Sequence, residues 1–159
     1  MKNSFLKIFI LISIWVSFLY GLKFLRKTYL ADVYYAKSQN LLKEADIKES
    51  QKYADLAVRL NPREANYYRG RAKVETVSLV SIPIYEQKEY KEDILKDLQY
   101  GFNLNKDNLV IIRNSIPLYF FISVFDLSEP ANPSNIDYEY LSYAEDFFNY
   151  AKTKYDHDA

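Results

Sequence analysis

The stretch 54-ADLAVRLNPREANYYRG-70 decides the fold, because a helical pattern stops within it and restarts a few residues later. Asp46, with Glu49 three residues on, forms an acidic variant of a capping box and predicts where the first of these helices begins. Asn61-Pro62 ends it, because the residue before a proline avoids the helical region. Between them, small and apolar side chains recur with a 3.6-residue period, at Ser50, Tyr53, Ala54, Leu56, Ala57 and Leu60.

Residues around this stop repeat at a spacing of 34, which pairs Ala31 with Ala65, Tyr34 with Tyr68 and Ser38 with Ala72. A period of 34 with two helices per unit resembles the tetratricopeptide repeat. The matching features are a large aromatic, a small residue four places on, two small positions in the second helix (Ala54, Ala57) and a closing proline, Pro62. Three residues depart from the pattern: Lys37 and Arg71 replace apolar residues, and Gly70 lies two places early.

The resemblance implies an all-α chain in which a short, right-handed α-solenoid occupies residues 28–155, with about three helix pairs over 31–64, 65–108 and 109–155. In the second unit we expect helices near 65–80 and 90–104, separated by the insertion 81-SIPIYEQKEY-90. The third unit contains the proline-rich loop 128-SEPANPSN-135 and ends in a helix over 137–155, where Ala144, Phe148 and Ala151 have the family spacing. Residues 156–159 are a tail.

Residues 1–27 are predicted to form a membrane anchor. The uncharged core from Ile8 to Leu22 would span about 22 Å as a helix, less than a hydrocarbon core of roughly 30 Å. Counting residues 5–25, with Lys7 and Lys23 snorkelling, gives about 31 Å. Trp15 and Tyr20 are candidate interfacial side chains. The prediction is a single-pass protein of the cell membrane that contacts lipid through this helix.

A cleaved signal peptide is the alternative, although Leu19 stands where a small residue is wanted before the cut. Lysines and arginines flank the core on both sides, so the positive-inside bias nearly cancels. The short N-terminal tail favours an extracytoplasmic repeat domain. Only Gly21, and no proline, interrupts residues 5–44, so we expect the anchor to continue as one helix into the first repeat.

The apolar segment from Leu109 to Leu127 is a second candidate for membrane contact. Arg113 and Asn114 lie inside it and Pro117 interrupts it. An arginine at mid-bilayer costs about 2.5–3.5 kcal/mol on insertion scales. We therefore expect a buried repeat helix, with a second span or a helix docked on the membrane surface as alternatives.

The composition offers little for catalysis, so we predict no enzymatic activity, no metal site and no cofactor. Cysteine is absent, the one histidine is His157 in the tail, and the three glycines are far apart, which excludes thiolate ligands, a Ser/His/Asp triad and a phosphate-binding glycine loop. The net charge of zero gives no nucleic-acid footprint. The acidic pairs Glu92-Asp93 and Glu145-Asp146 are interpreted as solvated helix faces. An enzyme acting on lipid or glycan remains a third class of function.

In the tetratricopeptide family the first helix of each unit lines a concave groove, and this defines the candidate binding site. An aromatic and three cations on that face would suit an acidic or extended segment of a protein partner. The alternative is that these are ordinary surface residues. Tyr35 and Gly70 stand where the family's carboxylate-binding constellation has Lys and Asn, so a chaperone-tail receptor is not expected. The candidate groove residues are Tyr35, Gln39, Leu42, Arg69, Lys73 and Arg113.

The whole chain also resembles the C-terminal part of some bacterial O-antigen ligase or polymerase-type membrane proteins, in which a last transmembrane helix leads into tetratricopeptide repeats. A hydrophobic span followed by four segments carries this resemblance: 30-LADVYYAKSQNLL-42, 53-YADLAVRLNPREANYYRGRA-72, 108-NLVIIRNSIPLYFF-121 and 140-YLSYAEDFFNYAKT-153. The catalytic, many-span portion of that family is missing from this sequence. The sequence therefore predicts a membrane-anchored adaptor for a protein partner, in cell-envelope assembly, or alternatively a non-catalytic accessory tail or split fragment of such a glycan machine.

Overall fold

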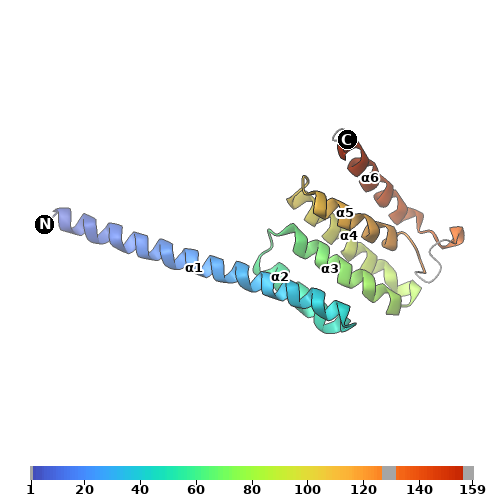
Figure 1. The fold of residues 1–159 in the computed structure, drawn as a ribbon, viewed down its shortest axis with the longest axis horizontal. Helices are drawn as coiled ribbons and strands as arrows, with labels where there is room; N and C mark the ends of the chain where they lie inside the picture. The colour runs from blue at the N-terminus through green and yellow to red at the C-terminus, as the bar shows by residue number, and fades with distance from the viewer. Residues whose placement is uncertain (1, 127–131, 156–159) are drawn as a thin grey trace.

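The computed structural model describes residues 2–126 and 132–155, with side chains from Lys7 onward, and over these residues the chain is all-helical. This confirms the predicted all-α class. Short 3-10 turns cover Leu79–Ser81, Ile84–Glu86 and Pro133–Asn135. The α-helices are α1 (Lys2–Lys43), α2 (Ile47–Leu60), α3 (Ala65–Ser78), α4 (Gln87–Leu104), α5 (Leu109–Ile122) and α6 (Tyr138–Tyr155) (Figure 1).

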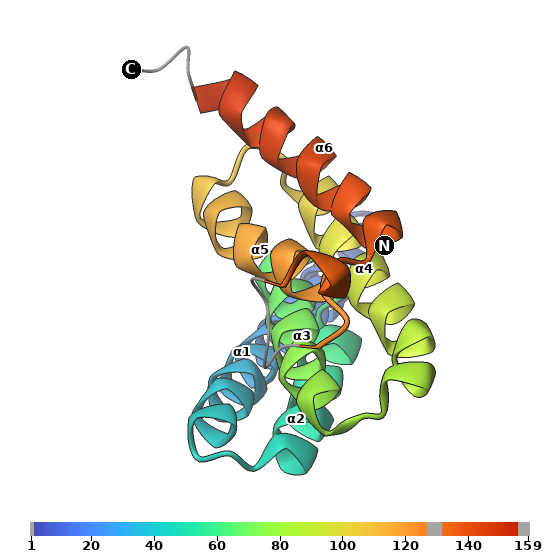
Figure 2. The same ribbon diagram turned by 90° about the vertical axis from the view of Figure 1, so that its right-hand side faces the viewer.

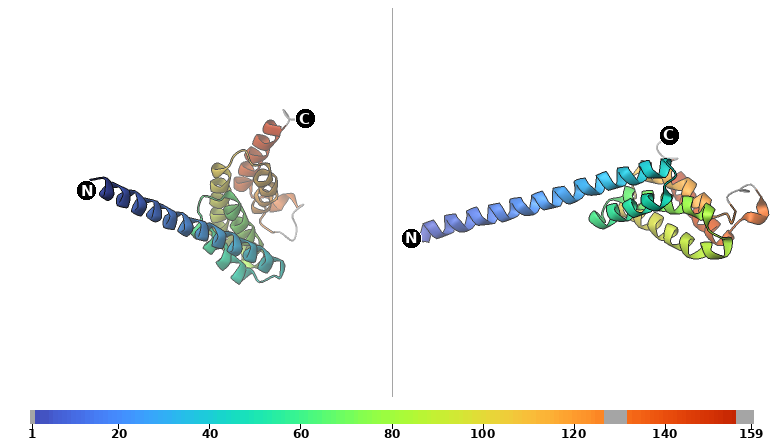
Figure 3. Two further views of the ribbon diagram at one scale, coloured as in Figure 1. Left: turned by 60° about the vertical axis from the view of Figure 1, so that its left-hand side comes forward. Right: turned by 90° about the horizontal axis from the view of Figure 1, so that it is seen from below.

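Helix α1 is unbroken, which confirms that the apolar segment continues into the first helix of the folded domain. Its 42 residues correspond to about 63 Å at about 1.5 Å per residue. The N-terminal part projects away from all other helices (Figure 3). Of the helices described, α1 is the one long and apolar enough to cross a membrane. The predicted anchor side chains Ile8, Trp15, Tyr20 and Leu22 are all exposed, at 57%, 57%, 75% and 46%.

The rest of the chain is built from helix pairs: the end of α1 packs on α2, α3 packs on α4, and α5 packs on α6. Helix α3 also contacts α2 and α5, so it lies at the centre of the domain (Figure 2). The small residues predicted at helix contacts are buried, because Ser38, Ala54, Ala57 and Ala72 are each at most 1% exposed. Ser50 adds a hydrogen bond from its hydroxyl to the Ser38 carbonyl oxygen, at 2.9 Å.

Helix α2 begins and ends where the sequence predicted. The Asp46 side chain accepts from the Glu49 N–H at 3.2 Å, and α2 ends at Leu60, directly before Asn61-Pro62. The capping box is only half formed, because the Glu49 carboxylate pairs with Lys52 at 2.9 Å rather than with the cap.

One expected boundary was wrong. Helix α4 begins at Gln87 rather than near Tyr90, because the Gln87 side chain donates to the carbonyls of Leu79 and Ile82, at 3.2 and 2.9 Å, and so fixes the turn before α4. Pro117 does not interrupt α5, which runs through it. Burial of one face of α5 compensates for the hydrogen bond that the proline cannot donate. That face is formed by Ile111, Ile112, Ser115, Leu118, Tyr119 and Ile122.

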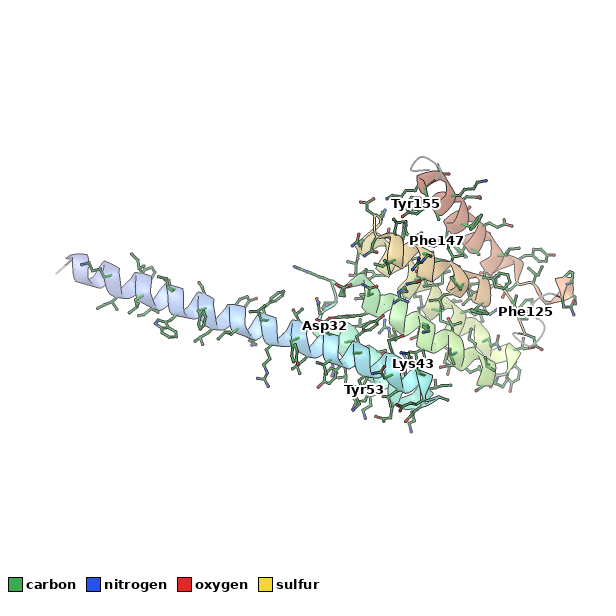
Figure 4. All side chains as sticks on the ribbon, viewed as in Figure 1. Asp32, Lys43, Tyr53, Phe125, Phe147 and Tyr155 are labelled. Carbon is green, nitrogen blue, oxygen red and sulfur yellow. The ribbon has the colours of Figure 1, made fainter. Side chains whose placement is uncertain are left out.

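The last helix differs from its expected packing at one position. Ala151 is buried as its spacing predicts, whereas Phe148 is 53% exposed. Its neighbour Phe147 is buried instead and stacks on Tyr119 of α5, with ring centroids 4.5 Å apart (Figure 4). Phe148 thus lies on the outer side of α6, where no further helix of the described chain covers it.

Candidate functional site

A groove of about 410 Å³ opens between α3 and α5, and we call it the α3–α5 groove. Helix α3 contributes two cations, one hydroxyl and one apolar side chain, and α5 contributes an amide and three apolar side chains. The groove therefore combines positive charge on one wall with a hydrophobic surface on the other. The lining residues are Arg69, Lys73, Thr76 and Val77 of α3 and Asn114, Pro117, Leu118 and Phe121 of α5.

Helix α1 supports Arg69 from behind. The Arg69 guanidinium donates to the Tyr35 hydroxyl at 2.8 Å, and Gln39 donates to the Gly70 carbonyl at 3.4 Å. The Tyr35 ring also packs against the Tyr67 ring, with centroids 5.3 Å apart. The predicted residues Tyr35 and Gln39 are therefore half-buried supports of Arg69 and do not line the groove.

Gly70 explains how the Tyr35 ring comes so close to α3. A Cβ atom built on Gly70 would lie 2.3 Å from Cε2 of Tyr35 and 3.1 Å from the side-chain nitrogen of Gln39. Any other residue at this position would displace Tyr35, which holds Arg69, and Gln39, which holds the Gly70 carbonyl. This early glycine, a departure from the repeat pattern, therefore makes room for the support of the groove.

The two groove cations have no carboxylate partner among the residues that the structure describes. The Arg69 Nε–H is buried and also lacks a hydrogen-bond acceptor there. A buried donor left unmatched costs about 1–3 kcal/mol. The charge of Arg69 and Lys73 is thus available to a ligand.

The other two predicted groove residues lie outside the groove. Leu42 is half-buried near the end of α1, and Arg113 is exposed on α5 beside the lining residue Asn114. Sequence reasoning missed the apolar wall, although Val77 follows Lys73 at i+4, and Asn114, Pro117 and Phe121 follow one another at i+3 and i+4. That helical spacing was the available signal, but it does not reveal which side of α5 faces α3.

A second polar cluster joins α2, α3 and α4 and has a structural role. Arg71 binds Asp97 through two hydrogen bonds, at 2.6 and 2.7 Å, and contacts Asp55 at 3.3 Å. Gln51 donates to Glu75 at 3.0 Å in the same cluster. Burial, followed by the nearby Asp97 charge, raises the pKa of Glu75 to about 7. Arg71 replaces the apolar residue of the repeat pattern because it ties three helices together.

Lys91 of α4 is a buried cation, 2% exposed, that the sequence did not reveal. Its ammonium group donates to Asp137 and to the Val124 carbonyl, both at 2.9 Å. It also lies over the rings of Phe125 and Tyr140, 4.9 and 5.2 Å from their centroids. Lys91 thus fixes the ends of the connection between α5 and α6 onto α4.

The acidic pairs offer no catalytic geometry in the described part of the chain. Glu92, Asp93, Glu145 and Asp146 are exposed. Within that part there is also no group of three or more His, Cys, Asp or Glu side chains that could hold a metal ion. His157 lies outside the described residues.

Comparisons with protein-family models, curated proteins and solved structures found no match. The resemblances to the tetratricopeptide repeat and to the O-antigen ligase tail therefore stay predictions. The α3–α5 groove and the exposed apolar part of α1 are the two features of this molecule that point to a function.

Proposed function

We propose that this chain is a membrane-anchored repeat adaptor whose α3–α5 groove binds an acidic, extended segment of a partner protein. The observation that carries the proposal is the pair of cations without a carboxylate partner, Arg69 and Lys73, which face the apolar α5 side chains that include Phe121. The cations select carboxylates, and the guanidinium can donate two parallel hydrogen bonds to one of them. The apolar wall selects a hydrophobic side chain beside the acids.

A tetratricopeptide-like solenoid is part of this proposal, and recurrent burial supports it. Four buried positions of α3 and the turn directly after it recur 43 residues later as buried positions of α5: Tyr68 and Ile111, Ala72 and Ser115, Thr76 and Tyr119, and Leu79 and Ile122. Helix pairs that repeat their contacts in this way stack into a continuous core with a concave face. The groove between α3 and α5 would then be part of that face.

Anchoring through α1 is the second part. The exposed apolar side chains of α1 would be unfavourable in water along such a length, and a bilayer would remove them from it. Since α1 continues without a break into the first helix pair, the domain would be held rigidly at the membrane surface. An adaptor held in this way presents its groove at a fixed height above the lipid.

The test of the proposal is partner capture after charge reversal in the groove. Full-length tagged chain is cross-linked in native membranes, extracted in detergent and analysed by mass spectrometry for co-purifying proteins. The Arg69→Glu/Lys73→Glu variant should lose at least nine-tenths of its partner. The matched control is Lys48→Glu/Lys88→Glu, which makes the same charge change at exposed sites on α2 and α4. Equal capture by the groove variant and the control would remove the groove from the proposal.

We also propose that the repeat domain lies on the extracytoplasmic side, as the short N-terminal tail favours. The absence of native cysteine allows a direct test. In intact cells, a Lys48→Cys variant should react with a membrane-impermeant maleimide. Reaction only after the cells are broken would place the domain in the cytoplasm.

A further inference from the structure

The outer face of the last helix pair carries an exposed apolar surface, which we call the α5–α6 end face. Phe120 and Phe148 are 48% and 53% exposed on it. They border a hollow of about 400 Å³ between the two helices. The residues of this face are Ile116, Phe120, Leu141, Ala144, Glu145, Phe148 and Asn149.

The internal repeat of the chain indicates which kind of structural element would pack on this face. Ile116 and Phe120 follow Lys73 and Val77 by 43 residues, and Lys73 and Val77 are the residues through which α3 faces α5. The end face thus repeats an α3 surface that, one pair earlier, faces a helix pair of this same chain across the α3–α5 groove.

A comparison of α6 with α4 independently indicates that a helix pair would pack on this face. Phe148 follows Leu98 of α4 by 50 residues, and the same offset pairs the buried Gly101 with the buried Ala151. Leu98 is 1% exposed and α5 packs over α4, whereas no helix of the described residues covers Phe148, which is 53% exposed. By this comparison, the structure that would fit over Phe148 is another helix pair.

The opposite end of the stack, formed by α1 and α2, presents a polar surface. The exposed side chains of α2 there are charged, among them Lys48, Lys52 and Arg59. Terminal pairs of helical repeats normally present such a polar outer face. A second chain that docked its α1–α2 end onto the end face would therefore bury charge against phenylalanine. Two end faces placed against each other would instead match apolar surface with apolar surface.

Charge and geometry also favour a self-complementary contact. The end face carries Glu145, while Arg113 and Lys152 stand one helical turn from Ile116 and Phe148, so a twofold-related copy supplies both signs of charge. The helix pairs follow one another across the direction of α1 (Figure 1), so the end face looks sideways relative to α1. Given the proposed anchoring through α1, two copies in one membrane can meet at this face.

From these observations we propose that the α5–α6 end face is a twofold interface with a second copy of this chain. A ring from each copy enters the hollow of the other. Because the contact joins the same face of the two copies, it forms a closed dimer and does not extend into a filament.

Site-specific cross-linking of the full-length chain in native membranes tests this interface, since the chain has no cysteine of its own. An Asn149→Cys variant should give a covalent homodimer with a short bismaleimide, and Lys48→Cys on α2 should give less than a tenth as much. Adding Phe148→Glu, a substitution at an exposed position that leaves the core intact, should reduce the Asn149→Cys dimer at least tenfold.

Three results would overturn the interface: no homodimer from Asn149→Cys, a homodimer that Phe148→Glu leaves unchanged, or a cross-link from this position to a different protein. The test is independent of the groove, because Arg69→Glu/Lys73→Glu in the Asn149→Cys chain should leave the dimer yield unchanged. It is also independent of the anchor, because the same homodimer recovered in the soluble fraction would keep the interface and remove the membrane span.

Discussion

At the scale of single residues, Gly70 connects the fold to the groove. Without a side chain at this position, the Tyr35 ring reaches α3 and holds Arg69 through its hydroxyl, at 2.8 Å. The sequence marked Gly70 only as a departure from the repeat pattern. A single sequence cannot show that the departure exists to admit a ring from α1.

Gly70→Ala should destabilise the chain, because its methyl group would overlap the Tyr35 ring. Overpacking of this kind costs about 1–3 kcal/mol. Chemical unfolding of the full-length chain in detergent, followed by circular dichroism, measures the change. Gly21→Ala is the control: a Cβ there meets nothing within 4 Å, so this variant should be neutral or slightly stabilised. Equal effects of the two substitutions would contradict the packing account.

Glu75 should make stability depend on pH. Burial raises its pKa in the folded chain from the ordinary 4.5 to about 7. Between these pH values the folded chain binds more protons than the unfolded chain, so the free energy of unfolding falls as the pH rises from about 4.5 to 7. Above pH 7 the loss is complete and amounts to about 3 kcal/mol, since one pKa unit is worth about 1.4 kcal/mol.

Glu75→Gln keeps the acceptor for Gln51 and removes the titration. At pH 8 it should raise the free energy of unfolding by about 3 kcal/mol, and near pH 4.5 it should change it little. Unfolding curves at several pH values test this, with exposed Glu89→Gln as the control. A Glu75→Gln variant that is less stable than the native chain at pH 8 would show that Glu75 is ionised and needed by Arg71.

At the scale of the elements, the helices followed from local signals and their contacts did not. The stop at Asn61-Pro62, the Asp46 cap and the continuity of α1 were all predicted, because each depends on a few neighbouring residues. The expected buried helix over the apolar segment formed as α5, because its buried contacts outweigh the local cost of Pro117. The apolar wall of the groove was missed, since the rotation of α5 about its axis is set by packing.

Lys91 is the element-scale interaction with the largest expected effect. Its removal in Lys91→Met would leave the Asp137 carboxylate and the Val124 carbonyl without this donor. Breaking a buried ion pair at one partner costs about 3–5 kcal/mol. Thermal unfolding of the full-length chain should show this loss, and exposed Lys88→Met on the same helix should show almost none. A Lys91→Met variant as stable as the native chain would mean that the pair contributes no net stability.

At the scale of the whole molecule, the proposed adaptor needs both α1, as the membrane anchor, and the groove, as the binding site. Arginines placed near the middle of the apolar segment, as in Ile12→Arg/Val16→Arg, should each cost about 2.5–3.5 kcal/mol of insertion. The native chain should stay with membranes after an alkaline wash, and this variant should be released. Tyr29→Arg, at an exposed position nearer the folded domain, should behave like the native chain. Release of the native chain itself would remove the anchor.

The central claim is that the α3–α5 groove binds an acidic, extended segment of another protein. The most direct measurement places a photo-reactive amino acid at Val77, on the groove wall, irradiates native membranes and sequences the attached peptide by mass spectrometry. We predict a protein segment with at least two Asp or Glu residues beside a hydrophobic one, and its loss in Arg69→Glu/Lys73→Glu. A lipid adduct, a basic segment, or an adduct that survives the charge reversal would contradict the account.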